Sequence, residues 1–319
     1  MMEFRILGPV GLWSENSEIL LNGTKQRTML AALLLADERV LPDYQLGEAL
    51  WGKEPPGTYQ AQIYTYASRL RQHLEGHAEI IRKGSGYMMR ILSARFDYSD
   101  FNTLSQAGHA ALWARKYAQA ADSLRAALSL WRGPTLTGVT DHLGEIEGPS
   151  IEEAQMETLE SRISADLALG RHDQLTSELV GLVRTYPLRE RLRAQLMAAL
   201  CASDRQAEAF AVFHEGRRQL EEELGVDPGA ALRHTYQAIL TGRIDETWHE
   251  SFVRTPVHST VGADVAGIDS LSVPFPSVPS VDPAELTGRG SRLFERAVRL
   301  DTAVEPHGPL LTAIRPRQP

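Results

Sequence analysis

Apolar and polar positions divide the chain into three stretches of different character. Residues 1–95 combine short apolar runs with helical spacing, whereas residues 97–245 keep the helical spacing almost throughout. Residues 246–319 lose this pattern and contain nine of the 17 prolines. We therefore predict a mainly α protein with an α+β N-terminal domain, an all-α second domain and a proline-rich linker or tail that is largely disordered.

The first stretch predicts a small sheet, three helices and a hairpin, in that order. The strand-like runs of the sheet are residues 4–7 and 18–21. The helices are expected at residues 25–36, 42–51 and 58–74, the last with Thr58 as its N-cap. Two further strand-like runs within residues 80–91 flank Gly84-Ser85-Gly86. A short helix, a longer helix and a hairpin are typical of a winged helix-turn-helix domain, which we assign to residues 1–95.

The second stretch contains an internal repeat. Two polar segments that each open an amphipathic helix begin around Arg171 and Arg205, which lie 34 residues apart. This interval is the period of tetratricopeptide helix pairs. A similar start at Arg115, and the end of a unit at Pro187, fit the same pattern. We therefore predict a tetratricopeptide-like helical repeat over residues 97–245.

The third helix has two distinct faces. At about 100° per residue, its apolar side chains fall within an arc of about 60° and predict a buried stripe, formed by Ile63, Ala67, Leu70 and Leu74. A polar face lies about 100° further round the helix and is formed by Gln62, Tyr66, Arg69 and His73, with Thr65 beside them. Such a face is either simply solvated or, because Arg and Gln can pair with guanine and adenine edges, a reader of the DNA major groove. Arg71 points away from Arg69, which indicates a phosphate contact or an ion pair.

Charge is unevenly distributed along the chain. Taken as a whole, the net charge of −8 argues against nucleic acid as a partner. Residues 53–90, however, hold six basic and three acidic side chains, whereas residues 96–245 hold 15 and 22. The local positive charge lies on the third helix and the hairpin, where Lys83 is placed to reach an adjacent groove of DNA.

Motifs for other chemistry are absent from the sequence. It has no phosphate-binding loop of the Walker type, no dinucleotide fingerprint and no histidine pair of a zinc helix. Its single cysteine excludes an internal disulfide and cysteine-rich zinc sites. We expect no enzymatic activity, no cofactor and no metal. Because there is no signal sequence and no apolar run of about 18 residues, we also predict a cytoplasmic protein without membrane contact.

Two groups of motifs give the chain a family resemblance. Motifs in the first stretch resemble the winged-helix domain of the Streptomyces antibiotic regulatory protein family, itself similar to the OmpR/PhoB DNA-binding domain: Leu46 to Gly52 with its Leu50-Trp51-Gly52, Pro55-Pro56, Tyr66 to Arg71, and Gly84-Ser85-Gly86-Tyr87. Four motifs in the second stretch resemble, in order, the bacterial transcriptional activation domain of that family: Leu130-Trp131-Arg132-Gly133-Pro134, Gly170-Arg171-His172, Tyr186-Pro187-Leu188-Arg189, and Leu224-Gly225-Val226-Asp227-Pro228. The resemblance covers about residues 2–245.

The resemblance implies an activator of an antibiotic or other secondary-metabolite gene cluster, which binds double-stranded promoter DNA and recruits RNA polymerase holoenzyme. The implied DNA contacts are to the major groove from Gln62, Thr65, Tyr66 and Arg69, to the backbone from Arg71 and Tyr87, and to the minor groove from Lys83. The implied polymerase contact is the loop that holds Lys53, Glu54, Pro55 and Pro56. Two protomers, as a homodimer or a side-by-side pair on DNA, are expected to bind direct repeats about 10 to 10.5 base pairs apart.

The third stretch, residues 246–319, departs from the family pattern. Leu286-Thr287-Gly288-Arg289 and Leu293-Phe294 resemble the entry to the ATPase domain of larger family members, as a remnant, a truncation or a coincidence, but no phosphate-binding loop follows them. We therefore predict no ATP binding. One alternative is open for the chain as a whole: a helical-repeat interaction scaffold or ligand sensor in which DNA binding is vestigial.

Overall fold

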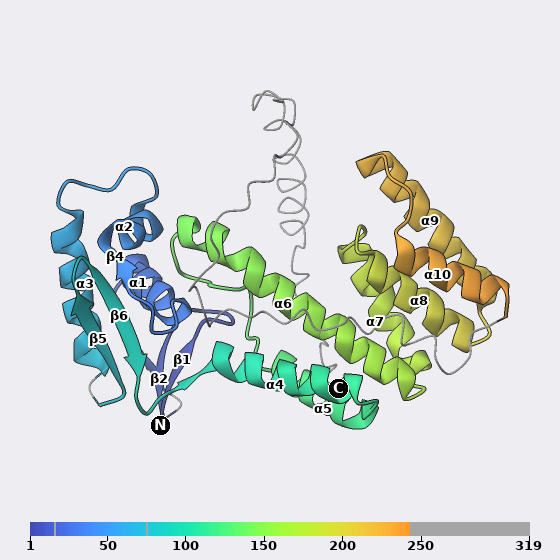
Figure 1. The fold of residues 1–319 in the computed structure, drawn as a ribbon, viewed down its shortest axis with the longest axis horizontal. Coiled ribbons are helices and arrows are strands. Elements are labelled where there is room, and N and C mark those ends of the chain that lie inside the picture. The colour runs from blue at the N-terminus through green and yellow to red at the C-terminus, as the bar shows by residue number, and fades with distance from the viewer. Residues whose placement is uncertain (16, 75, 243–319) are drawn as a thin grey trace, which may run out of the picture. The chain divides into compact units, whose positions relative to one another are not determined.

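Short strands near the N-terminus form two separate sheets (Figure 1). The computed structural model describes residues 1–15, 17–74 and 76–242. The first sheet has the order β3-β2-β1-β7 and consists of β1 (Met2–Arg5), β2 (Gly11–Ser14), β3 (Ser17–Ile19) and β7 (Arg95–Phe96). In it, β7 runs parallel to β1, and the other pairs are antiparallel. The second sheet is antiparallel, has the order β4-β6-β5 and consists of β4 (Leu41–Pro42), β5 (Ala78–Lys83) and β6 (Gly86–Ile91).

The first sheet differs in detail from the strands that the pattern predicts. The predicted run 4–7 is β1, shifted two residues toward the N-terminus, and the run 18–21 overlaps β3. The pattern does not predict β2, because four residues after a Gly-Pro turn carry too little periodicity to be recognised as a strand. Pairing creates this strand, since Leu12 lies opposite Phe4 in the register and both side chains are fully buried.

Three helices follow strand β3 and confirm the predicted winged helix-turn-helix. They are α1 (Thr24–Leu35), α2 (Asp43–Trp51) and α3 (Tyr59–Leu74), each within a residue of the predicted bounds. Most of α1 is buried, from Gln26 to Leu34, as its mostly apolar second half predicts. Helices α2 and α3 both pack on α1, and α3 also lies along β5 (Figure 1).

The remaining helices form the predicted helical domain. They are α4 (Asp97–Trp113), α5 (Tyr117–Leu128), α6 (Asp141–Ala168), α7 (His172–Thr185), α8 (Glu190–Ala202), α9 (Gln206–Leu224) and α10 (Ala230–Leu240). Each helix from α4 to α9 packs against its neighbour in the chain, as in a repeat of antiparallel helix pairs. The fold prediction, a winged domain followed by helical pairs, is confirmed. The glycine- and proline-marked segment 133–150 is only partly a loop, because α6 begins at Asp141 and runs through Pro149.

Three turns of this domain share one geometry, which accounts for the repeat in the sequence. Each turn has a residue with positive φ followed by a basic residue that directly precedes a helix: Arg115 (56°) and Lys116, Gly170 (75°) and Arg171, Asp204 (59°) and Arg205. In each turn the amide of the basic residue donates to the carbonyl five residues earlier, at 2.8 to 3.0 Å: Ala111, Asp166 and Leu200. This pattern closes one helix and starts the next. The helix starts expected around Arg171 and Arg205 are thus confirmed.

The apolar core continues across residue 96. One buried cluster contains Phe4, Leu30, Leu46 and Ile63 of the winged domain together with residues of the helical domain: Phe101, Ala127, Leu136, Leu143 and Ile151. Two further clusters lie within the helical domain, one around Met197 and one around Leu124. The domain that carries α3 is therefore packed directly on α4 to α6.

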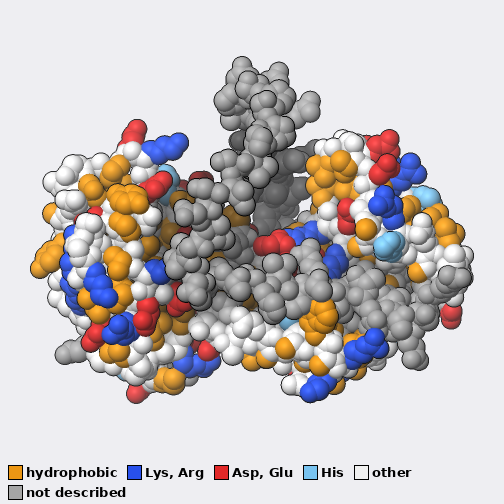
Figure 2. Space-filling view, in the orientation of Figure 1, with side chains coloured by type: hydrophobic (Ala, Val, Ile, Leu, Met, Phe, Trp, Pro, Cys, Tyr) orange, Lys and Arg blue, Asp and Glu red, His pale blue; other side chains and the backbone are white. Residues whose placement is uncertain are grey.

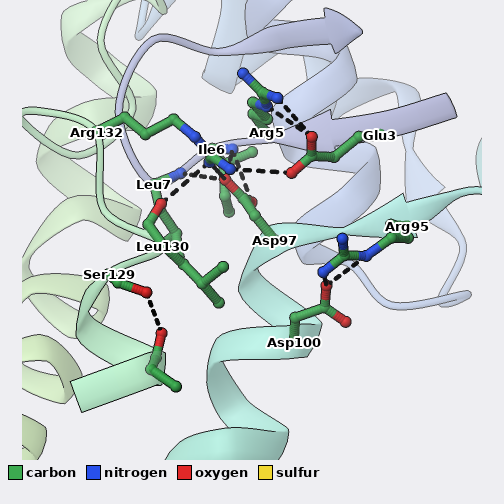
Figure 3. Close-up of polar contacts among 11 residues, drawn as sticks. Glu3, Arg5, Ile6, Leu7, Arg95, Asp97, Asp100, Ser129, Leu130 and Arg132 are labelled. Atoms are coloured by element: carbon green, nitrogen blue, oxygen red, sulfur yellow. Dashed lines mark hydrogen bonds and ion pairs between the residues drawn. The ribbon is translucent and has the colours of Figure 1, made fainter. Parts of the chain in front are cut away.

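A buried carboxylate strengthens this junction (Figure 3). Asp97, 1% exposed, accepts hydrogen bonds from the amides of Ile6 at 3.0 Å and Leu7 at 3.2 Å. It also accepts one from Arg132 Nη1 at 3.2 Å, while Nη2 of the same arginine donates to Glu3 at 3.0 Å. Burial raises the pKa of Asp97 from 3.8 to about 6, against the opposing effect of these donors. The first strand, α4 and the loop after α5 are thus joined at one point.

The predicted linker or tail at residues 246–319, including the segment similar to an ATPase-domain entry, lies outside the described residues. Among the helices that are described, none is long and apolar enough to cross a lipid bilayer.

Candidate nucleic-acid interface

Helix α3 is placed as its sequence pattern predicts. Its buried residues are Ile63, Ala67, Leu70 and Leu74, the predicted apolar stripe. Thr58 directly precedes the helix, and its carbonyl accepts the amide of Gln62 at 3.1 Å. The Thr58 hydroxyl accepts from the Gln62 side-chain amide, also at 3.1 Å. Thr58 therefore stands at the predicted N-cap position, and its hydroxyl orients one of the predicted reading side chains.

The predicted reading face is only partly open to solvent. Thr65 and Arg69 are exposed, whereas Gln62 and Tyr66 are half-buried. The ring of Tyr66 lies against that of Trp51, with centroids 6.4 Å apart. Lys25 supports this pair, because its ammonium group lies 4.6 Å from the Trp51 ring and donates to the Leu50 carbonyl. Helices α1 and α2 thus hold Tyr66 in place, and Arg69 is the most accessible long side chain among the four predicted readers.

Two accessible side chains were missed by the sequence pattern. Tyr64 is 64% exposed, and Gln60 is exposed one turn earlier on the same side of α3. Both lie on the side of the helix that faces the β5–β6 hairpin, and both line a groove of about 390 Å³ between the two elements. Helical periodicity predicts the buried side of α3. It does not predict which side of the exposed surface of the helix lies next to the hairpin.

Arg71 and Tyr87 are engaged inside the domain. Arg71 donates from Nε to the carbonyl of Ile80 at 2.8 Å, and its guanidinium carbon lies 5.9 Å from the ring centroid of Tyr87. Tyr87 is only 2% exposed and lies at the bottom of the groove. A direct backbone contact made mainly by Tyr87 does not fit this burial. Arg71 joins α3 to β5, and the ring of Tyr87 packs near the Arg71 guanidinium group.

Two neighbouring basic side chains of the hairpin are both exposed but differ in their contacts. Lys83 is exposed at the end of β5, opposite Gly86. Its neighbour Arg82 instead forms two hydrogen bonds to the carboxylate of Asp43, at 2.6 and 2.7 Å, and stacks over Tyr87 at 4.6 Å. Sequence reasoning did not identify this pair, because the two residues are 39 positions apart.

The loop between α2 and α3 is accessible but anchored at its start. Lys53, Glu54 and Pro55 are exposed, and Pro56 is half-buried, with its carbonyl accepting the amide of Tyr59 at 2.8 Å. Gly52 is buried with a φ of +66°, and a side chain there would come within 2.5 Å of the His142 ring. The first turn of α6 thus backs the loop, and Thr140 just before it donates to the Ala49 carbonyl at 2.6 Å.

The interface combines accessible cations with a rigid base. Within the described ranges, no carboxylate lies at ion-pair distance from Arg69, Lys83 or Lys53. In Figure 2, basic side chains gather over the part of the view that holds α3, β5 and β6. An exposed polar helix face beside a basic turn is suited to a helix in the major groove and a hairpin at the backbone or minor groove.

Comparison with known proteins gives this arrangement a context. Residues 96–240 match the family model described as bacterial transcriptional activator domain, and residues 17–89 match that of transcriptional regulatory protein, C terminal. The chain is 32% identical over 252 residues to the regulatory protein DnrI of Streptomyces peucetius, covering 75% of this chain and 92% of DnrI. It is 40% identical over 240 residues to the regulatory protein AfsR of Streptomyces coelicolor, and this match covers 75% of this chain but only 24% of AfsR. The chain thus spans about a quarter of the length of that relative.

A solved structure shares the fold as well. The structure of Mycobacterium tuberculosis EmbR in complex with a low-affinity phosphopeptide superposes with a TM-score of 0.73 at 30% sequence identity. The superposition covers 79% of this chain and 68% of EmbR.

Proposed function

The chain belongs to the Streptomyces antibiotic regulatory protein family of transcriptional regulators, and on this premise we propose that it activates a secondary-metabolite gene cluster by binding promoter DNA. In this proposal, α3 enters the major groove and the β5–β6 hairpin contacts the neighbouring backbone or minor groove. The activity is binding and recruitment rather than catalysis, in the cytoplasm.

One observation carries the proposal most directly. Arg69 on α3 and Lys83 on the hairpin are both exposed, and they stand on two elements that the Arg71 to Ile80 hydrogen bond ties together. A reader needs its groove contact and its backbone contact at a fixed separation, because the spacing of DNA grooves is fixed. A polar face that only contacts water does not require a hydrogen bond that fixes its distance from the hairpin.

The proposed roles differ among the predicted residues. Arg69 reads base edges, with Thr65 beside it, while Gln62 and Tyr66 contribute from their half-buried positions. Lys83 makes the contact to the minor groove or backbone. Arg71 and Tyr87 act mainly by joining α3 to the hairpin, and Tyr64 adds an accessible side chain at the edge of the groove.

Activation requires a second surface. We assign it to the loop with Lys53, Glu54, Pro55 and Pro56, which is accessible to RNA polymerase holoenzyme and is backed by α6. The winged domain has a small excess of positive charge, while residues 96–245 are acidic. A lone protomer should therefore bind DNA modestly and with strong salt dependence, which favours pairs on direct repeats about one helical turn apart.

DNase I footprinting of the purified chain on the promoters that flank its own gene tests the proposal. We expect tandem protected sites whose centres lie about 10 to 10.5 base pairs apart, and extended protection when RNA polymerase holoenzyme is added. An Arg69→Ala, Lys83→Ala double variant should lose the protection. Arg184→Ala, which removes an exposed cation on α7, serves as the control and should keep it.

The opposite result would favour a different class of protein. If no flanking promoter is protected, and the chain binds a peptide or small molecule with defined stoichiometry, the helical-repeat scaffold or ligand sensor is the better description.

A further inference from the structure

Asp43 places a negative charge in the surface that is proposed to face DNA. It is the first residue of α2, is 5% exposed, and lines the groove between α3 and the hairpin together with Arg71 and Arg82. Because DNA is a polyanion, a carboxylate at this place is expected to repel phosphate and to weaken binding. Its contacts indicate a different role.

The Asp43 carboxylate binds Arg82 in a bidentate geometry. Nη1 and Nη2 of Arg82 donate to the two carboxylate oxygens at 2.6 and 2.7 Å, an arrangement that fixes both distance and orientation. Nε of the same arginine donates to the carbonyl of Gly84 at 3.1 Å, inside the hairpin turn. The face of the guanidinium lies over the buried ring of Tyr87. All three guanidinium nitrogens of Arg82 therefore donate to acceptors of this domain, although 44% of the side chain is exposed.

The backbone of Asp43 holds the same turn. Its amide donates to the carbonyl of Ser85 at 2.8 Å. The two preceding residues form β4 and pair with β6, with Leu41 opposite Tyr87 and Pro42 opposite Gly86. Gly86 lies so close to β4 that a side chain at this position would collide with the Leu41 carbonyl oxygen. The hairpin turn thus rests on the N-terminal end of α2, which also favours a carboxylate at Asp43.

Lys83 lies between the fixed points of this arrangement. Arg82 precedes it, Gly84 and Ser85 follow it, and each of these three residues is hydrogen-bonded either to Asp43 or to Arg82. The Lys83 side chain itself is exposed. A turn that is fixed before binding loses less conformational entropy when its lysine meets a phosphate or a groove.

We propose that the Asp43–Arg82 pair is a positioning clamp for the hairpin turn, through which an acidic residue strengthens DNA binding by presenting Lys83. The inference rests on the proposed function. Asp43 is a positioning residue here and touches no DNA. The clamp predicts the opposite sign from simple electrostatics, in which removal of an acid near DNA tightens binding.

The test compares two acid-to-amide substitutions that change the net charge equally. Asp43→Asn removes the charge of the clamp, whereas Glu79→Gln removes an exposed charge on the same hairpin. Binding of the full chain to a fluorescein-labelled duplex of mixed sequence is followed by anisotropy at several salt concentrations. We expect Asp43→Asn to bind up to about fivefold more weakly and to lose up to about one unit of salt slope, as far as removal of Lys83 itself would, while Glu79→Gln binds as tightly as the parent or slightly more tightly.

A double variant separates positioning from general damage. If Asp43 acts through Lys83, then Asp43→Asn should weaken binding little further in a Lys83→Ala background. Additive losses, or an Asp43→Asn variant that binds like Glu79→Gln, would overturn the clamp. Thermal melting of each variant verifies that it is folded.

Arg82→Lys provides a second route should Asp43→Asn fail to fold. It preserves the net charge and Asp43 but removes the bidentate geometry. The clamp predicts that Arg82→Lys weakens binding of the parent chain but weakens it little further in the Lys83→Ala background. Parent-like binding of Arg82→Lys would contradict the clamp. If the parent chain shows no salt-dependent binding to the duplex, the proposed function and the clamp both fail; if the parent binds and the Asp43 and Arg82 variants match it, only the clamp fails.

Discussion

Arg69 of α3 differs in its surroundings from the arginines around Asp166 in the helical domain. Arg69 on α3 is exposed and has no carboxylate partner within the described part of the chain. In the helical domain, Asp166, 3% exposed, binds arginines from its own and neighbouring segments: Arg171 at 2.7 Å, Arg125 at 3.1 Å and Arg162 at 3.4 Å. The same residue type therefore stabilises helix packing in one region and remains available for a partner in the other.

This difference explains why net charge is a poor guide to the partner. The helical domain is acidic, but several of its carboxylates are neutralised internally, as at Asp166 and at Glu160 with Arg189. In the winged domain, the clamp neutralises Arg82 and leaves Lys83 accessible. What a charge does depends on whether the fold supplies its counter-charge. Four substitutions test this contrast.

The largest effect is expected at Asp166. Asp166→Asn should lower the free energy of unfolding by about 3 kcal/mol, because this one buried carboxylate binds Arg125, Arg162 and Arg171 at once. Arg162 keeps its other partner, Glu178. Urea denaturation followed by circular dichroism measures the change, and DNA binding of the folded fraction should stay at the parental level. Asp122→Asn is the control, since Asp122 pairs with Arg125 at the surface and should contribute less than about 1 kcal/mol. Equal losses in the two variants would show that burial of the carboxylate does not matter.

The next effect is a pH dependence set by Asp97. Its pKa is raised from 3.8 to about 6 by burial, so between these values the folded chain holds a proton that the unfolded chain has released. The free energy of unfolding should therefore fall as pH rises from about 4 through about 6, by up to about 3 kcal/mol from this group. Asp97→Asn lacks this titration, so the difference in urea midpoint between parent and variant isolates it. A difference that stays constant between pH 4 and pH 7 would contradict the assignment.

A smaller effect, on binding rather than stability, is expected at Arg69. Arg69→Ala should weaken binding to a footprinted promoter site by about 1–3 kcal/mol and relax the base preference there, because it removes the proposed base-edge contact. Stability should change by less than about 0.5 kcal/mol, since the side chain is exposed. Competition with point-substituted sites measures the preference. Arg184→Ala, the exposed control on α7, should leave the preference unchanged.

The smallest effect is expected at Lys83. Lys83→Ala should weaken binding to all sequences to a similar degree, by roughly 1 kcal/mol, and lower the salt slope by about one unit. Mobility-shift titrations at several salt concentrations provide the measurement. Lys116→Ala removes an exposed lysine from the helical domain and should leave the slope at the parental value. A loss confined to one sequence would instead make Lys83 a base reader.

Local pattern predicted the elements of the site better than its side-chain contacts. The buried stripe of α3 and the exposure of Thr65, Arg69 and Lys83 agree with the sequence reading, since helical periodicity and turn position fix them. The burial of Tyr87 disagrees with a direct contact to DNA, because β4 and the Arg82 side chain cover it. The helical pattern does not identify the accessible Tyr64, because the groove that Tyr64 lines exists only where the hairpin packs beside α3.

By itself, the sequence determined the helices, their order, the repeated turns before Arg171 and Arg205, and the family, since these depend on neighbours within a few residues or on ordered motifs. Only the tertiary structure decided which charges are neutralised. Asp43 meets Arg82 across 39 residues and Asp97 meets Ile6 across 91, and no local periodicity encodes such pairings. They arise when the core brings distant segments together, and burial then makes each unpaired charge costly enough to select its partner.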